Sequence, residues 1–399
     1  MANTKFYSSK TVSMIKLFAF FVLFIFYSPF VYSQDIPVFQ SGQDGYSSYR
    51  IPAIIKDKQG RLIAFAEGRV NDAGDYGNVD IVYKISADNG KSWGSVKVAV
   101  DAGNLQAGNA APVVDLHDKA YPNGRIFLFY NTGNNHESEV RAGKGSREVW
   151  YITSADNAQT WSAPVNITAQ VHKIKKPSAD STTAVVNDWR TYANTPGHAM
   201  QFVTGKYKGR LYVAANHSQG PPQKAGKDYF AHGFYTDDHG KTFSLSTTIP
   251  FEGGNESMAA QVSANELYMN TRNQQGNMRN RIISYSANGG QSWDTTFYDS
   301  NLPDPINQGS TLSWLDKKQF ILAVCNAADT KNRDNLTLRL SKDKGKSWYF
   351  SKVIAKSTGE YKGSYAAYSD LVLLHKKKLG VLYEKDNYNQ IVFTTVNMD

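Results

Sequence analysis

The stretch Ser86-Ala-Asp-Asn-Gly-Lys-Ser-Trp93 decides the fold of this chain, because its pattern occurs five times. Each copy carries a Ser or Thr, an acid or amide two residues later, a small residue, a second hydroxyl residue and an aromatic residue. The other copies are Ser154–Trp161, Thr236–Phe243, Ser286–Trp293 and Ser341–Trp348. Their first residues lie 68, 82, 50 and 55 residues apart. Internal repetition of this kind indicates a repeat architecture.

One copy predicts a tight turn. Asp88 can accept hydrogen bonds from nearby backbone N–H groups, Gly90 can adopt a positive φ, and Ser92 can close the local network. The aromatic residue Trp93 can then pack beneath the turn. Alternating strand patterns precede most copies, as in Asp80–Ile85, Arg147–Ile152 and Leu336–Leu340. Strand–turn–strand units at this spacing predict the blades of a β-propeller, with about four strands in each blade.

The rest of the chain supports an all-β fold. It is 41% hydrophobic and 13% aromatic, and we find no sustained apolar period of 3.6 residues. Five marked units, and one unmarked unit where the chain ends meet, predict a six-bladed β-propeller of four-stranded antiparallel blades. Acidic turns of this appearance also suggest calcium. Each copy offers one carboxylate at most, and Asn288 replaces the acid in one of them, so we expect structural turns and no metal.

Residues 1–33 have the order of a secretory signal peptide. Lys5, Lys10 and Lys16 precede an apolar run, and a small residue, Ser33, stands at the expected cleavage point. The alternative is a membrane anchor, but the apolar run falls short of the roughly 20 residues that span a bilayer. We therefore expect export to the periplasm or the cell exterior, no stable membrane span, and a single domain over residues 34–399. The only cysteine, Cys325, is predicted to be a buried and inert thiol.

The charge balance favours an anionic ligand. The formal net charge of +9 falls to +6 once the three lysines of the leader are removed. Basic residues do not alternate with aromatic residues along the chain, so we expect no nucleic-acid partner.

The repeats resemble the Asp boxes of the sialidase family, and Tyr49-Arg50-Ile51-Pro52 resembles that family's (F/Y)RIP motif. The resemblance extends from about residue 38 to the C-terminus. It implies a six-bladed propeller with the active site on its axis, and an exo-α-sialidase that removes terminal sialic acids from glycans with retention of configuration. It implies no metal and no cofactor, and we expect a monomer.

A sialic acid carries a carboxylate on its anomeric carbon, and guanidinium groups bind carboxylates bidentately. The resemblance identifies Arg50, Arg272 and Arg333 as the three arginines that bind this carboxylate. Clustered guanidinium groups repel one another, so a counter-charge is needed. Glu384 matches the family carboxylate that braces the first of these arginines.

Sialidases differ from most retaining glycosidases because their nucleophile is a tyrosine. A neutral phenol can approach the anionic substrate, whereas a carboxylate nucleophile would be repelled by it. The phenol must lose its proton during attack, and a neighbouring carboxylate can accept that proton. By resemblance, Tyr368 is the nucleophile and Glu256 is its base.

The acid that protonates the leaving oxygen is expected on the loop after Arg69. By resemblance it is Asp75, with Asp72 as the competing candidate, while Asp80 begins a strand and is expected to be structural. Arg69 resembles a residue that contacts the O4 side of the sugar, and Asp115 is a weaker companion. The N-acyl pocket should be apolar and aromatic, but no motif identifies its residues.

Other functions remain open at this point. The same scaffold could act on Kdn or Kdo, or transfer sialic acid to an acceptor, because the three arginines recognise only the carboxylate. A carbohydrate-binding propeller without catalysis would lack one of the catalytic residues. A purely structural propeller with Asp boxes would lack the arginines.

Overall fold

Strands account for nearly all regular structure in the computed structural model, which describes residues 1–6, 35–174, 188–358 and 363–398. Within those ranges there are 25 strands and only short helical segments. The helical segments are α1 (Glu137–Arg141), α2 (Thr168–Val171) and the 3-10 turn η1 (Lys224–Gly226). The chain is therefore all-β, as the sequence predicts.

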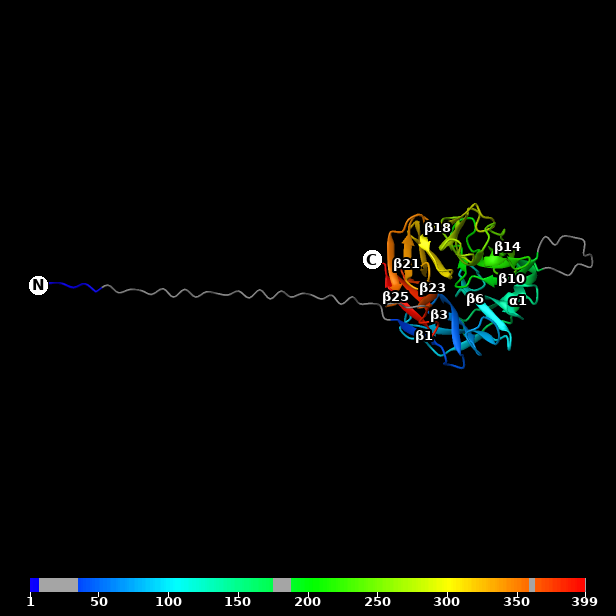
Figure 1. Ribbon diagram of the computed structural model, residues 1–399, viewed down its shortest axis with the longest axis horizontal. Coiled ribbons are helices and arrows are strands. Elements are labelled where there is room, and N and C mark those ends of the chain that lie inside the picture. The colour runs from blue at the N-terminus through cyan, green and yellow to red at the C-terminus, as the bar shows by residue number, and fades with distance from the viewer. Residues whose placement is uncertain (7–34, 175–187, 359–362, 399) are drawn as a thin grey trace, which may run out of the picture. The chain divides into compact units, whose positions relative to one another are not determined.

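The strands form five sheets in which all pairs but β4 with β6 are antiparallel, and three of these sheets have four strands. The first contains β15 (Gly254–Gln261), β16 (Leu267–Asn273), β17 (Asn280–Ser286) and β18 (Thr295–Pro303). The second contains β19 (Gly309–Asp316), β20 (Gln319–Ala327), β21 (Leu336–Ser341) and β22 (Phe350–Ala355). The third contains β23 (Ala366–His375), β24 (Lys378–Lys385), β25 (Gln390–Asn397) and β1 (Ile36–Gln40). In this last sheet β1 pairs with β25, so the two ends of the domain meet, as expected for the unmarked unit (Figure 1).

Two further sheets are larger. One contains β10 (Trp189–Asn194), β12 (Leu211–Gln219), β13 (Tyr229–Thr236) and β14 (Ser244–Leu245), with β11 (Met200–Gln201) paired to β12. The other has eight strands: β2 (Ser48–Lys56), β3 (Leu62–Arg69), β4 (Val79–Ser86), β5 (Lys97–Val100), β6 (Gln106–Asp115), β7 (Arg125–Gly133), β8 (Arg147–Ser154) and β9 (Val165–Asn166). Hydrogen bonding thus gives five sheets among the described residues, and six separate blades are not confirmed by this count.

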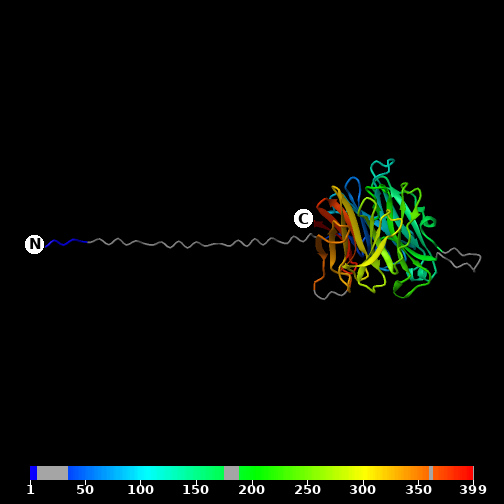
Figure 2. The ribbon, with the colours of Figure 1, turned by 90° about the horizontal axis from the view of Figure 1, so that it is seen from above.

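Six strands follow one another in a closed order. Strand β2 contacts β6 and β23, β10 contacts β6 and β15, and β19 contacts β15 and β23. This is the arrangement of a propeller, with one strand of each unit turned to a common centre. Figure 2, which turns the view by 90°, shows the strands running between two ends where the turns gather.

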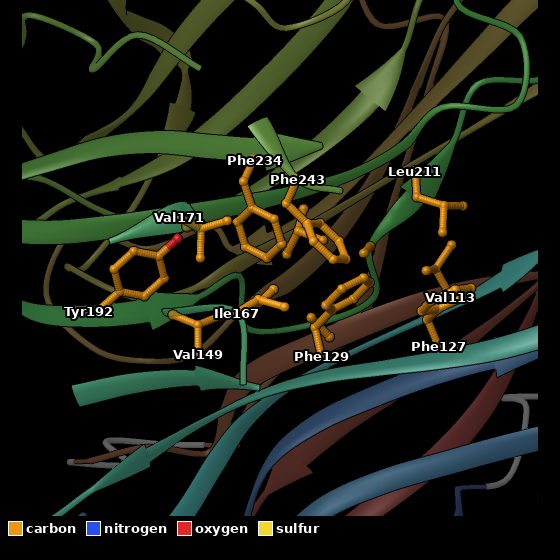
Figure 3. Packing of buried hydrophobic residues seen from close by; sticks show 14 of the residues in the cluster. Val113, Phe127, Phe129, Val149, Ile167, Val171, Tyr192, Leu211, Phe234 and Phe243 are labelled. Atoms are coloured by element: carbon orange, nitrogen blue, oxygen red, sulfur yellow. The ribbon is translucent and has the colours of Figure 1, made fainter. Parts of the chain in front are cut away.

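Aromatic and aliphatic side chains fill the space between neighbouring sheets. Figure 3 shows one such cluster, in which Phe129 of β7 faces Phe234 of β13 and Phe243, while Phe127 of the same strand lies beside Val113. The rings of Phe129 and Phe234 meet edge to face, with centroids 5.6 Å apart. Such contacts add to the free energy gained by burying apolar surface, and they fix how one sheet packs against the next.

All five repeats form turns between consecutive strands, namely β4 and β5, β8 and β9, β13 and β14, β17 and β18, and β21 and β22. In the first copy, the hydroxyl of Ser92 donates to Oδ2 of Asp88 at 2.6 Å, and these hydrogen bonds lower the pKa of Asp88 to about 2. Gly90 has φ +85°, where only glycine is unstrained. In the fourth copy, the amide of Asn288 donates to Ser292 instead, which preserves the turn without a charge. The predicted turns are confirmed.

Two other predictions concern the leader and the cysteine. The expected signal peptide falls mainly in residues 7–34, which lie outside the described residues. Among the helices that are described, none has the length and apolar character to cross a membrane. Cys325 is 0% exposed in β20, and burial raises the pKa of its thiol to about 12, which confirms a buried and inert group.

Candidate active site

A cavity of about 290 Å³ opens where strands of several sheets converge. Seven of the nine site residues predicted from the sequence line it: Arg50, Arg69, Asp75, Glu256, Arg272, Arg333 and Tyr368. They come from distant parts of the chain, and the closed order of the sheets brings them together. Glu384 lies behind the cavity wall, and Asp115 lies elsewhere.

Arg50, in β2, is held by a buried carboxylate. Its Nε donates to Oε1 of Glu384 at 2.7 Å, and Glu384 is 0% exposed. The same carboxylate accepts hydrogen bonds from the backbone N–H of Ile51 at 2.9 Å and of Tyr368 at 3.2 Å. The ring of Tyr388 lies 3.8 Å from the guanidinium carbon of Arg50. Glu384 thus makes the expected contact with Arg50 and also anchors the backbone at Tyr368.

The phenol of Tyr368, at the start of β23, lies between a base and a cation. Its oxygen is 2.7 and 2.8 Å from the two carboxylate oxygens of Glu256 in β15. Nη1 of Arg272, in β16, donates to the same phenol oxygen at 2.7 Å and to Oε2 of Glu256 at 2.7 Å. The expected pair of tyrosine and glutamate is therefore in direct contact, with an arginine bonded to both members.

Burial raises the pKa of Tyr368 well above its ordinary value, and the charge of Glu256 adds to this rise. The cations of Arg272, Arg333 and Arg50 act in the opposite direction. The hydroxyl is therefore protonated at neutral pH, beside a base that can take the proton and cations that would stabilise the phenolate.

Arg333 completes the group of three arginines from the segment between β20 and β21. Its Nη1 donates to the hydroxyl of Tyr388 at 2.8 Å, and its guanidinium carbon is 5.4 Å from the centroid of the Tyr368 ring. The hydroxyl of Tyr388 also lies 2.7 Å from that of Ser364. The guanidinium groups of Arg50 and Arg333 therefore lie near the Tyr368 ring and that of Arg272 contacts its hydroxyl, and this concentration of positive charge suits a carboxylate ligand.

Asp75 reaches the cavity from the loop between β3 and β4. Its side chain is 69% exposed, and Oδ1 lies 2.8 Å from Nη1 of Arg69. Desolvation raises the pKa of Asp75, but the charges of Arg69 and Arg50 outweigh it, so the pKa lies below its ordinary value. Asp72 does not line the cavity, and its Oδ1 instead accepts from the backbone N–H of Gly74 at 2.6 Å.

Asp80 makes the structural contact expected of it. It is 7% exposed in β4, and its Oδ2 accepts from the hydroxyl of Tyr46 at 2.7 Å. Burial raises the pKa of this carboxyl.

The expectation that Asp115 contacts the sugar needs correction. Gln106 and Asn109 of β6 line the cavity, but Asp115 stands six residues beyond Asn109, about 20 Å further along an extended strand. Asp115 is 0% exposed, and its carboxylate accepts from Gln201 and lies 2.7 Å from Nδ1 of His239. The sequence pattern identified a strand that does reach the cavity, but it selected the opposite end of that strand.

Sequence reasoning missed Glu67, which holds Arg69. Its Oε2 accepts from Nη2 of Arg69 at 2.7 Å, and its Oε1 accepts from the backbone N–H of Asn109 at 2.9 Å. The signal was available, because residues two apart on a strand point to the same face. Tyr388 was also missed, and no motif surrounds it.

The cavity wall also differs from the apolar N-acyl pocket that was expected. Its lining is mainly polar, and the apolar contributions among the described residues are Ile51, Ala193 and aromatic rings. Glu137, Arg147 and Tyr229 lie on the wall formed by β8, β13 and the short helix α1. None of these three was identified from the sequence.

Comparison with known proteins gives a consistent result. Residues 52–381 match the family model described as BNR repeat-like domain. An exo-alpha-sialidase of Arthroderma benhamiae is 28% identical, over 86% of this chain and 79% of that protein. A sialidase of Micromonospora viridifaciens is also 28% identical, over 89% of this chain but 52% of that protein, so this chain spans about half its length. Among solved structures, the Hadza microbial sialidase Hz136 matches with a TM-score of 0.73 at 22% identity, over 91% of this chain and 68% of that chain.

Proposed function

This chain belongs to the BNR repeat-like domain family, and from that membership and the cavity we propose that it is an exo-α-sialidase. It hydrolyses terminal sialic acids from glycoproteins, glycolipids and oligosaccharides. The observation that carries the proposal is the contact of the Tyr368 hydroxyl with both Glu256 and Arg272, inside a group of three arginines. The sialidases named above support it.

The three arginines account for substrate binding. A sialic acid carboxylate needs several charge-assisted donors, and Arg50, Arg272 and Arg333 all line one cavity. Glu384 neutralises part of their charge and holds Arg50 in place. Binding therefore places the anomeric carbon near the Tyr368 oxygen, since Arg272 contacts both the cavity and that oxygen.

The first chemical step forms a bond between the Tyr368 oxygen and the anomeric carbon, and it breaks the glycosidic bond. Glu256 takes the phenol proton, and protonated Asp75 gives its proton to the leaving oxygen. Asp75 pairs with Arg69, so a sugar that engages Arg69 would weaken this ion pair and let the carboxyl take up a proton.

The second step hydrolyses the tyrosyl intermediate. Asp75 takes a proton from water, the resulting hydroxide attacks the anomeric carbon, and the Tyr368 oxygen regains its proton from Glu256. Two displacements at one carbon retain the configuration. No step requires a metal or a cofactor.

Two structural proposals accompany the function. We count the eight-stranded sheet as two blades, because β4 and β6 share one pair of residues, Val79 and Gln106. This gives six blades of four main strands. We also propose that residues 1–33 direct export and are removed, so that glycans outside the cell are accessible. Mass determination of the exported protein tests the second point, since it should begin at Gln34.

The experiment that tests the function follows an aryl α-sialoside by proton NMR during hydrolysis by the purified protein. The proposal predicts that the α-anomer of free sialic acid appears first and then mutarotates. Release of the β-anomer first would contradict retention, and failure to hydrolyse the sialoside would contradict the proposed activity itself.

A further inference from the structure

Tyr388 lies between two of the three arginines of the cavity. It stands in the turn that joins β24 to β25, where no sequence motif identifies it. Its ring lies 3.8 Å from the guanidinium carbon of Arg50, and its hydroxyl accepts from Nη1 of Arg333 at 2.8 Å. A cation over an aromatic face is attracted to the negative charge of that face. One side chain therefore contacts two arginines that lie far apart in the sequence.

Arg333 depends on this contact more than the other arginines depend on theirs. Arg50 and Arg272 each pair with a glutamate at 2.7 Å. Within the described residues Arg333 has no carboxylate partner, and the hydroxyl of Tyr388 is the one group that accepts a hydrogen bond from its guanidinium. A neutral hydroxyl does not cancel the charge of a cation. Arg333 thus keeps its full positive charge for a ligand, while Tyr388 holds its position.

The direction of the hydrogen bonds around the Tyr388 hydroxyl follows from the arginine. A guanidinium can only donate, so the hydroxyl accepts from Arg333 and has its own proton left to donate. Oγ of Ser364 lies 2.7 Å away and can receive it. The backbone N–H of Ala366 donates to the carbonyl of Arg333 at 3.0 Å, so the segments of Ser364 and Arg333 are neighbours. The three side chains form one directed chain of hydrogen bonds.

The backbone conformation at Tyr388 is costly. Asp386, Asn387 and Tyr388 have φ values of +56°, +51° and +65°, all in the left-handed region. Asp and Asn tolerate this region, whereas a bulky residue is strained in it. The backbone N–H of Asn387 donates to the carbonyl of Ser364 at 2.8 Å, which holds the turn against the segment that precedes β23. Such strained residues cluster at functional sites, which points to a role for the Tyr388 side chain.

We propose that Tyr388 is a positioning residue for binding of the substrate carboxylate, an inference that rests on the proposed function. Its ring holds the guanidinium of Arg50, and its hydroxyl holds that of Arg333. The protein thereby sets the spacing of these two groups, so substrate binding does not have to order them.

The bond-making step at Tyr368 does not depend on this contact. The hydroxyl of Tyr368 bonds to Glu256 and Arg272, and neither of these contacts involves Tyr388. A carboxylate that is held equally well in the ground state and in the transition state contributes to KM and not to kcat. Loss of the Tyr388 hydroxyl should therefore raise KM and leave kcat nearly unchanged.

The test measures kcat and KM for an aryl α-sialoside, with the whole protein and with variants of it. Tyr388→Phe removes the hydroxyl and keeps the ring, whereas Tyr388→Leu removes both. Arg333→Gln is made alone and together with Tyr388→Phe. Tyr298→Phe is the matched control, because Tyr298 is also half-buried, donates to Oδ1 of Asn277 at 3.1 Å and does not line the cavity. Thermal unfolding curves check that each variant is folded.

Tyr388→Phe should raise KM by about tenfold, as expected for a hydrogen bond to a charged group. It should change kcat by less than about threefold, and Tyr388→Leu should raise KM further. In Arg333→Gln the additional change Tyr388→Phe should have almost no effect, because the hydroxyl then holds no cation. Tyr298→Phe should change neither constant.

Two results would overturn the proposal. One is a Tyr388→Phe variant with the KM of the unmodified protein. The other is a change Tyr388→Phe that has the same effect with and without Arg333, since a merely structural role would act in both backgrounds. The Tyr388→Phe variant keeps the ring and so tests the proposal even if Tyr388→Leu does not fold.

Failure of the proposed function is a separate result. Calorimetric binding of the 2,3-didehydro analogue of sialic acid, which carries the carboxylate and is not hydrolysed, measures positioning without turnover. If the unmodified protein binds this analogue about tenfold more tightly than Tyr388→Phe but hydrolyses no sialoside, the positioning role holds and the enzymatic function fails. If the two proteins bind the analogue equally well, or neither binds it, the positioning role fails.

Discussion

At the scale of single residues, Asp75 and Asp72 show how the structure separates two similar candidates. Both are exposed acids on one loop, but Asp75 lines the cavity beside Arg69, whereas Asp72 accepts from the backbone of Gly74. The sequence alone could only rank the two residues as candidates for the acid. Their contacts support the proposal that Asp75 protonates the leaving group, and they leave Asp72 with a contact inside its own loop.

We predict that Asp75→Asn lowers kcat/KM for an alkyl-linked sialoside by about 10²- to 10⁴-fold, the range typical of general acid catalysis. An activated aryl sialoside should lose much less, because its leaving group needs little protonation. Asp72→Asn is the matched control and should change both rates little. Equal losses of Asp75→Asn on the two substrates would contradict its role as an acid.

The pH dependence provides a second prediction at this scale. The cation of Arg69 lowers the pKa of Asp75, so removing that cation should raise the pKa. In the proposed mechanism protonated Asp75 is the active form for departure of the leaving group, and a higher pKa keeps it protonated to higher pH. We therefore expect Arg69→Gln to move the high-pH limb of the kcat/KM profile upward, even though the absolute rate falls. Arg69→Lys keeps the charge and should leave the limb closer to its original position.

At the scale of elements, the repeated turns depend on the small residue at their fifth position. Gly290 has φ +85°, and an added Cβ would stand 2.2 Å from the ring of Tyr212. Ala158 occupies the equivalent position of another turn at φ +61° and is 0% exposed. One turn thus accepts the methyl group that another excludes.

We predict that Gly290→Ala lowers the free energy of unfolding by about 2 kcal/mol or more, from left-handed backbone strain and overpacking together. The reverse change, Ala158→Gly, should alter it by less than about 1 kcal/mol, because relieved strain offsets the lost methyl contact. Chemical denaturation of the two variants gives both values. Similar values for the two would contradict the steric argument.

The elements were largely predictable because their signals are local. The expected strands over 80–85, 147–152 and 336–340 appear as β4, β8 and β21, since alternating side chains suit a strand with two different faces. The turns were predictable for the same reason. The grouping of strands into sheets was less predictable. One parallel pair of residues joins β4 to β6, and no sequence pattern predicts such a contact.

At the scale of the whole molecule, the site forms because the sheets follow one another in a closed order. Arg50, Glu256 and Tyr368 are more than 100 residues apart in sequence, and only the order of the sheets brings them into one cavity. Sequence motifs could identify these three residues because each lies in a segment that resembles a motif of the sialidase family. Glu137 and Arg147 carry no such motif, and they line the cavity only because the closed order of the sheets brings α1 and β8 to it. Asp115 was misplaced because a motif does not say which end of a strand faces the cavity.

Buried histidines provide a prediction on the stability of the whole fold. His172, His217 and His232 are at most 7% exposed, and Nδ1 of His217 lies 3.1 Å from Nδ1 of His232. Burial lowers the pKa of His172 to about 3, and it lowers the pKa values of the other two well below their ordinary range, with Lys173 acting in the same direction. The folded protein therefore keeps these histidines neutral in mild acid.

The unfolded chain protonates its histidines below about pH 6.5, whereas the folded protein protonates His172 only near pH 3. The contribution of these histidines to the free energy of unfolding is thus complete above pH 6.5, and it falls as the pH decreases below that value, by about 1.4 kcal/mol per pH unit for each of them. His172→Phe should reduce this slope, while His375→Gln, at an exposed site, should not. The measurement is the free energy of unfolding of each protein between pH 7 and 4. A free energy of unfolding that does not change over this range would contradict the prediction.

The central claim is that Tyr368 becomes covalently attached to the sugar. The most direct test treats the protein with a sialyl fluoride that carries a second fluorine at C3, which slows both steps while fluoride departs readily, and then locates the added mass by peptide mass spectrometry. The account predicts one added sugar on the peptide that contains Tyr368, and none in Tyr368→Phe. A sugar attached to Glu256 or to any other residue, or turnover without an adduct in a protein that releases the β-anomer first, would contradict it.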